Sequence, residues 1–181
     1  MTLADELYKK YMRTYTNKWV DPFEMEADDI DHRDIAHGLS NICRFGGQAS
    51  HFYSVASHSI KVFLRVKDVL KNQATNDILL AAILHDATEA YLGDIITVLK
   101  YRPEFKLYRT AEAKLNNVIE SKYNIKLSKE DRAVIKEADQ FICKEEKLTV
   151  FSKDDSRIEM KKSEQLFLTI FNALTQGKYE S

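Results

Sequence analysis

An acidic side chain falls on the apolar face of a predicted helix. Ile135, Ala138 and Ile142 recur at helical spacing, and Asp139 lies on the face that they form. Burying an unpaired carboxylate is costly, so such a group is normally paired, hydrogen-bonded or bound to a metal. Asp139 is therefore a candidate metal ligand, although burial beside a lysine or arginine would also explain it.

Two histidines and a second aspartate interrupt other apolar segments. His58 lies within an apolar helical pattern, and the pair His85-Asp86 follows the apolar run 78–84. On its own, His58 could be a hydrogen-bonded core histidine. Together with Asp139, these residues offer imidazole nitrogens and carboxylate oxygens, which suit Mn, Fe, Co, Ni, Zn or Mg better than a thiolate-rich zinc site would. Such a ligand set leaves coordination positions for water and substrate, as catalytic metal sites do.

Further carboxylates follow the His85-Asp86 pair. Glu89 comes one helical turn later, so a continuous helix would place all three side chains at neighbouring positions. A bound divalent cation lowers the pKa of water and polarises a phosphoryl oxygen. Glu89 lies in mostly apolar sequence and is a candidate general acid or base with a raised pKa. Asp94 follows the predicted helix end and could orient the attacking water or the leaving group.

The elements that would carry these residues are helical. Glycine occurs 5 times and proline 2 times, and no Val/Ile/Thr-rich stretch alternates as a strand does, so we predict an all-α fold. Residues 76–91 are apolar on nearly every side, which indicates a buried helix. Asp31 and Ser128 are the expected N-caps of their helices. The predicted helices cover residues 3–12, 31–43, 53–71, 76–91, 107–123, 128 onward and 158–174.

Length and composition predict one globular domain over residues 1–181. The chain is 44% hydrophobic and 30% charged, with a formal net charge of -1. This balance argues against a partner that is polymeric nucleic acid held by broad electrostatics. The sequence has no apolar signal region and no run that approaches the ~20 residues needed to cross a bilayer, so no membrane association is expected. Cys43 and Cys143 fit no zinc ribbon or secreted framework, which favours reduced thiols in a cytoplasmic protein.

Four segments, taken in order, resemble the H…HD…D signature of the HD superfamily of phosphohydrolases. They are residues 54–59 around His58, residues 84–90 around His85-Asp86, the pair Gly93-Asp94, and Asp139. The block 85–94, with Cys43-Arg44-Phe45 upstream, is similar to two branches of that superfamily. One branch is the small bacterial 5'-deoxynucleotidases, and the other is the phage-type deoxynucleoside triphosphohydrolases that remove dATP. The similarity covers residues 35–139.

The resemblance implies an all-α HD-domain helical bundle with a buried metal site, a divalent metal cation as cofactor, and a small-molecule nucleotide as substrate. Related small HD enzymes assemble as dimers or hexamers, so a homo-oligomer is expected. The resemblance also implies roles for particular residues. The metal ligands would be His58, His85, Asp86 and Asp139, and the catalytic carboxylates would be Glu89 and Asp94.

Three further residues are candidate substrate contacts. The resemblance puts Arg44 against substrate phosphate, although Arg44 could instead pair with Asp31 or Asp34. Phe45 occupies a position where the 5'-deoxynucleotidases have tryptophan, and its ring can stack on a base or sugar. Lys100, in the loop after the Gly-Asp pair, is a candidate phosphate contact, although charged loop residues are usually solvated.

We therefore expect metal-dependent hydrolysis of a deoxynucleotide. The short chain and the segment 44–47 favour a triphosphohydrolase of the dATP type, which releases deoxynucleoside and triphosphate. The alternative is a 5'-deoxynucleotidase acting on deoxynucleoside monophosphates. A further alternative is a regulatory module that binds nucleotide or metal without turning it over. The presence of both Glu89 and Asp94 argues against that module, because a pure binder needs no spare carboxylates.

Overall fold

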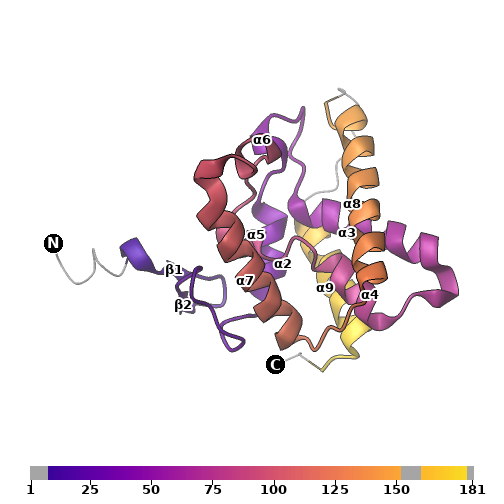
Figure 1. Ribbon diagram of the computed structural model, residues 1–181, viewed down its shortest axis with the longest axis horizontal. Coiled ribbons are helices and arrows are strands. Elements are labelled where there is room, and N and C mark those ends of the chain that lie inside the picture. The colour runs from indigo at the N-terminus through magenta and orange to yellow at the C-terminus, as the bar shows by residue number, and fades with distance from the viewer. Residues whose placement is uncertain (1–7, 152–159, 179–181) are drawn as a thin grey trace.

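Helices dominate the structure. The computed structural model describes residues 8–151 and 160–178, and Figure 1 shows a helical bundle with a small β-hairpin at its side. The hairpin pairs β1 (Met12–Arg13) with β2 (Trp19–Val20) in antiparallel orientation. The predicted all-α fold is confirmed. The α-helices are α2 (His32–Asn41), α3 (Val55–Leu70), α4 (Asn76–Ile83), α5 (Glu89–Leu92), α6 (Thr97–Lys100), α7 (Lys106–Lys122), α8 (Lys129–Thr149) and α9 (Met160–Thr175).

Side-chain caps start two of the helices at the expected residues. The Asp31 carboxylate accepts a hydrogen bond from the backbone N–H of Arg33 at the start of α2. Ser128 and Asp131 form a reciprocal capping box at the start of α8, which satisfies two backbone N–H groups that the helix leaves unpaired. Both caps confirm the predicted helix starts.

The chain ends differ from the predicted helices. Residues 8–10 are helical, but Met12 belongs to β1, so the predicted helix over 3–12 ends early. The rest of that predicted helix, residues 3–7, lies outside the described residues. The predicted helix over 158–174 corresponds to α9, and residues 158–159 also lie outside the described part of the chain.

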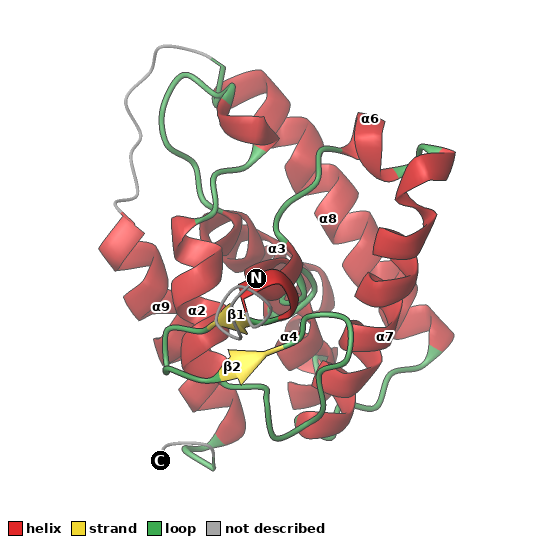
Figure 2. Ribbon diagram, turned by 90° about the vertical axis from the view of Figure 1, so that its left-hand side faces the viewer, coloured by secondary structure: helices red, strands yellow, loops and turns green. Residues whose placement is uncertain are grey.

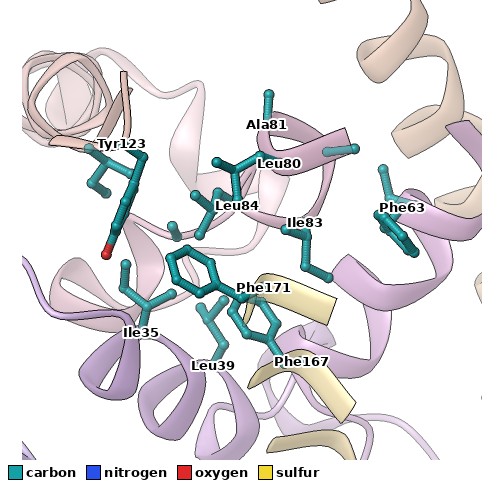
Figure 3. Close-up of a cluster of buried hydrophobic side chains, with 14 of the residues drawn as sticks. Ile35, Leu39, Phe63, Leu80, Ala81, Ile83, Leu84, Tyr123, Phe167 and Phe171 are labelled. Carbon is teal, nitrogen blue, oxygen red and sulfur yellow. The ribbon is translucent and has the colours of Figure 1, made fainter. Parts of the chain in front are cut away.

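The hydrophobic core joins the helices that carry the candidate site. Phe167 and Phe171 of α9 are fully buried, and Figure 3 shows their rings between Ile35 and Leu39 of α2 and the Ile83 side chain. Helix α3 packs against α2, α4, α8 and α9. This burial fixes α3 relative to its neighbours and therefore sets where the side chains of α3 and α8 meet. Figure 2 shows the β-hairpin outside this bundle, with α2 and α9 to one side of it and α7 to the other.

The predicted central helix over 76–91 is interrupted, which corrects the prediction. Helix α4 ends at Ile83, and α5 begins only at Glu89. In an unbroken helix, the Ala82 carbonyl would accept from the N–H four residues later. Instead, that carbonyl lies 2.9 Å from Nδ1 of His85, and tighter turns follow, with the N–H of Ala87 bonded to the Leu84 carbonyl at 2.8 Å. The His85-Asp86 pair therefore lies in a turn rather than on a helix.

Two smaller expectations concern cysteines and membranes. Cys43 and Cys143 are both free thiols. Within residues 8–151 and 160–178, no helix combines the length and the apolar character that a bilayer span requires.

Candidate metal and active site

The structure brings the four predicted ligands together from three parts of the fold. His58 comes from α3, His85 and Asp86 from the turn after α4, and Asp139 from α8. Nε2 of His58 lies 3.3 Å from Nε2 of His85 and 3.0 Å from Oδ1 of Asp139. Oδ2 of Asp86 lies 3.2 Å from Nε2 of His85. His58, His85 and Asp86 offer ligand atoms within 4.8 Å of one another.

The outer nitrogen of each imidazole is already engaged. Nδ1 of His85 faces the Ala82 carbonyl at 2.9 Å, and Nδ1 of His58 faces a Glu146 carboxylate oxygen at 2.9 Å. A carbonyl or an ionised carboxylate can only accept, so each Nδ1 carries a hydrogen. In the neutral rings, both Nε2 lone pairs then point into the space that the carboxylates of Asp86 and Asp139 also face. While both rings are neutral, such a set of donors is mutually repulsive unless a positive charge, either a proton or a metal ion, lies among them, so these residues fit a divalent metal.

Opposite charges keep the two aspartates ionised. Burial by itself raises the pKa of Asp86, but His85, His58 and Arg44 outweigh it and hold that pKa well below the usual value. Burial also raises the pKa of Asp139, but the hydrogen bond with His58 and the charge of His85 outweigh it, so the pKa of Asp139 lies below its usual value. Both carboxylates are therefore available as charged oxygen donors near neutral pH.

Glu89 has the opposite character. Its side chain is buried, and Oε2 makes no hydrogen bond within the described residues. Burial, together with the charges of Asp86 and Asp94, raises the pKa of Glu89 to about 10. Asp94 is partly buried, and burial raises its pKa as well, although Arg44 lowers it. Glu89 is thus held protonated beside the cluster, as a proton donor would be.

Arg44 pairs with neither of the acids that the sequence suggested. Asp31 binds Arg33, and Asp34 accepts hydrogen bonds from Thr16. The Arg44 guanidinium instead lies 3.5 Å from Oδ2 of Asp86. Its charge therefore reaches the candidate metal site directly.

The other two predicted substrate contacts have different partners. The ring of Phe45 is partly buried, with its centroid 5.4 Å from the Arg44 guanidinium carbon and 5.5 Å from the Phe151 ring. Lys100 pairs with Glu112 at 2.5 Å. Phe45 therefore packs over Arg44, whereas Lys100 is paired with Glu112.

Glu146 is a buried part of the site that the sequence pattern did not reveal. Neighbouring lysines suggest that Glu145 and Glu146 form exposed pairs on α8. The structure corrects this for Glu146, which is 1% exposed and contacts His58. The available signal was spacing, because Glu146 follows Asp139 by two helical turns and so shares its face.

A cavity of about 440 Å³ opens beside the predicted ligands, within the size range of small-molecule sites. Lys100 lines it, but Arg44 and Phe45 do not. Lys136 of α8 lines the cavity one turn before Asp139, and its ammonium group makes no hydrogen bond or ion pair with any other described residue. The remaining walls combine apolar and polar side chains from α4, the turn 84–88, α7, α8 and the 123–127 segment: Ala81, Leu84, Thr88, Arg109, Glu112, Ala113, Asn116, Ile119, Glu120, Ile125, Leu127, Arg132 and Ile135.

Comparison with known proteins identifies the family. The family model described as 5'-deoxynucleotidase YfbR-like matches residues 35–170, which include all four predicted ligands. The chain belongs to the YfbR-like family. This family lies within the HD superfamily, so the resemblance seen in the sequence is confirmed at that level. Its 5'-deoxynucleotidase description also favours that branch over the dATP triphosphohydrolases that the sequence suggested.

Two relatives of this YfbR-like protein share its sequence over part of their length. The uncharacterized protein YfdR of Escherichia coli is 38% identical over 116 residues, which cover 64% of this chain and 59% of YfdR. An uncharacterized protein of Rhodobacter capsulatus is 37% identical over 97 residues, covering 51% of this chain and 47% of the relative. The matched segments thus span 59% of YfdR and 47% of the Rhodobacter capsulatus protein, so this chain covers less than two-thirds of either relative.

Proposed function

We propose that this protein is a metal-dependent 5'-deoxynucleotidase, which removes the phosphate of deoxynucleoside monophosphates. The observation that carries the proposal is the convergence of His58, His85, Asp86 and Asp139 beside a nucleotide-sized cavity, which the last three of these residues line. Membership of the YfbR-like family supports the same reaction. A triphosphohydrolase, which the sequence favoured, is the second candidate, because the cavity could also take a longer phosphate chain.

The proposed ligands define where the chemistry would occur. His58, His85, Asp86 and Asp139 would hold one divalent cation. When bound, that cation would supply a water of lowered pKa and a Lewis acid for a phosphoryl oxygen. The metal could be Co, Mn, Zn, Fe, Ni or Mg, since the nitrogen and oxygen donors suit all of them.

The neighbouring carboxylates would move the protons. Attack of water on phosphorus forms a new P–O bond and breaks the bond between phosphorus and the 5' oxygen. Glu89, which burial keeps protonated, would give its proton to that departing oxygen. Asp94 would accept the proton that the attacking water loses. Deoxynucleoside and inorganic phosphate result, with the protons balanced.

The cavity walls suit the two halves of a nucleotide. Lys136 lies near Asp139, where an unpaired ammonium group would attract a phosphate. The walls also include apolar side chains such as Leu127, together with the polar side chains of Asn116 and Glu120. Apolar surface with a few hydrogen-bonding groups is the usual environment for a planar base.

A product assay tests the proposal. Metal-depleted protein is reloaded with Mn²⁺ or Co²⁺ and given each deoxynucleoside monophosphate and triphosphate, and products are separated by chromatography. We expect inorganic phosphate and deoxynucleoside from the monophosphates. The variant Asp139→Asn, purified identically, controls for contaminating phosphatases. Release of triphosphate with no turnover of monophosphates would favour the second candidate, and no hydrolysis of either would contradict both.

A further inference from the structure

A second carboxylate of α8 lies directly behind the proposed metal site. Glu146 is 1% exposed, although the residues on either side of it, Glu145 and Lys147, are exposed. It follows Asp139 on the same face of the helix. A charged group at such depth requires partners that compensate for the lost hydration.

The partners of Glu146 come from three other segments. Its Oε1 accepts a hydrogen bond from the Tyr53 hydroxyl at 2.7 Å and lies 2.9 Å from Nδ1 of His58. Its Oε2 lies 3.3 Å from Nη2 of Arg44. Hydrogen bonding thus holds Oε1, whereas Oε2 has the ion-pair contact with Arg44 but no hydrogen bond within the described residues.

Arg44 connects this carboxylate back to the ligand cluster. Its guanidinium lies 3.3 Å from Glu146 and 3.5 Å from Asp86. Asp86 in turn lies 3.7 Å from Nε2 of His58. His58, Glu146, Arg44 and Asp86 therefore form a closed ring of charged and polar groups, of which Asp86 lines the cavity.

The contact with His58 determines which ring nitrogen carries the hydrogen. An ionised carboxylate beside Nδ1 favours the tautomer with hydrogen on Nδ1, which leaves the Nε2 lone pair free to bind a cation. Carboxylates in this position orient metal-binding histidines and raise their basicity. If Glu146 served only to balance the charge of Arg44, it would not need to contact His58.

We propose that Glu146 is a positioning residue that holds His58 in the orientation and tautomer that a divalent cation requires. The inference rests on the metal site of the proposed function. It adds a residue that would act through the imidazole of His58 rather than by contact with metal or substrate.

Metal titration of the protein tests the inference without reference to catalysis. Metal-depleted wild type and Glu146→Gln are titrated with Mn²⁺ by calorimetry. Because Gln removes the charge that favours hydrogen on Nδ1, we expect the affinity for Mn²⁺ to fall about 10–100-fold. The matched control is Glu145→Gln, which makes the same charge change at the neighbouring exposed position and should leave the affinity unchanged.

The variant Glu146→Asp separates positioning from neutralisation of Arg44, and it also serves if Glu146→Gln does not fold. Aspartate keeps the negative charge opposite Arg44 but is one methylene shorter, so it withdraws from His58. We expect a loss of Mn²⁺ affinity here too. Long-range ¹H–¹⁵N spectra of the Zn²⁺-loaded proteins should show hydrogen on Nδ1 of His58 in the wild type and altered Nδ1 and Nε2 signals in both variants.

The titrations distinguish failure of the positioning role of Glu146 from failure of the proposed metal site. Wild-type protein that binds neither Mn²⁺ nor Zn²⁺ would overturn the metal site and the role of Glu146 together. Tight wild-type binding that both Glu146 variants retain, with unchanged His58 signals, would overturn only the role of Glu146.

Discussion

Asp86 and Glu89 lie three residues apart, yet their surroundings push their pKa values in opposite directions. Asp86 faces two imidazoles and Arg44, whereas Glu89 is buried near other carboxylates. Pairs of titratable groups separated in this way mark acid and base roles in active sites. At this scale, Asp86 suits a charged ligand and Glu89 suits a proton donor.

Replacing Glu89 by glutamine should therefore slow the hydrolysis of substrate and leave metal binding intact. We expect kcat for phosphate release to fall about 10²–10⁴-fold, the usual contribution of a positioned general acid. The affinity for Mn²⁺ should change little, because Glu89 is outside the converging His58, His85 and Asp86 group. Parallel kinetics and calorimetry check both parts. Loss of Mn²⁺ binding would instead make Glu89 a ligand.

Lys136 is the cavity cation best placed to attract a phosphate. In Lys136→Gln we expect KM for a deoxynucleoside monophosphate to rise roughly tenfold with kcat nearly unchanged, because a charged hydrogen bond to bound substrate is lost. Lys144→Gln is the matched control, since Lys144 is also exposed on α8 but does not line the cavity. Equal KM values for wild type and Lys136→Gln would contradict this contact.

At the scale of elements, the break between α4 and α5 positions the reactive residues. The turn 84–88 carries His85 and Asp86 toward α3 and α8, and α5 then returns against α2. Gly38 of α2 allows this close approach, because a Cβ atom at that position would lie 3.0 Å from Cβ of Ala90. The separation of α2 and α5 thus depends on one missing methyl group.

Gly38→Ala should displace the helix that carries Glu89. Overpacking typically costs about 1–3 kcal/mol, and the gain in helix propensity of ~1 kcal/mol offsets part of it. We expect a net destabilisation of about 1 kcal/mol, measured by urea unfolding, together with reduced kcat. Adding Ala90→Gly should restore only part of the loss, because Cα and the carbonyl oxygen of Ala90 are also 3.1 and 3.2 Å away. If Gly38→Ala were as active and as stable as the wild type, the prediction would be wrong, because α5 would then tolerate the added methyl group.

At the scale of the whole molecule, the proposed metal site joins parts of the chain far apart in sequence. His58, His85 and Asp139 come from α3, the turn after α4, and α8. A cation bound to all of them favours the folded chain, because the unfolded chain does not bring them together. The homo-oligomer expected from related enzymes stays a prediction.

Removing the metal should therefore lower the thermal stability. When free metal exceeds Kd a thousandfold, binding stabilises the fold by about 4 kcal/mol, and each kcal/mol shifts Tm by about 2–4 °C at this chain length. We expect a lower Tm after chelation, recovery on adding Mn²⁺, and no such response in Asp139→Asn. Differential scanning calorimetry measures all three. A wild-type Tm that is indifferent to chelator and metal would argue against the site.

Local sequence patterns determined the helical class, the caps at Asp31 and Ser128, and the four residues that interrupt apolar faces. These features depend on spacing along one helix, which sequence displays directly. The break after Ile83, the burial of Glu146 and the true partners of Arg44 depended on tertiary structure. Each arises from contacts between segments far apart in the chain, where side-chain hydrogen bonds and ion pairs compete with helix geometry and solvent. No local pattern reports the outcome of that competition.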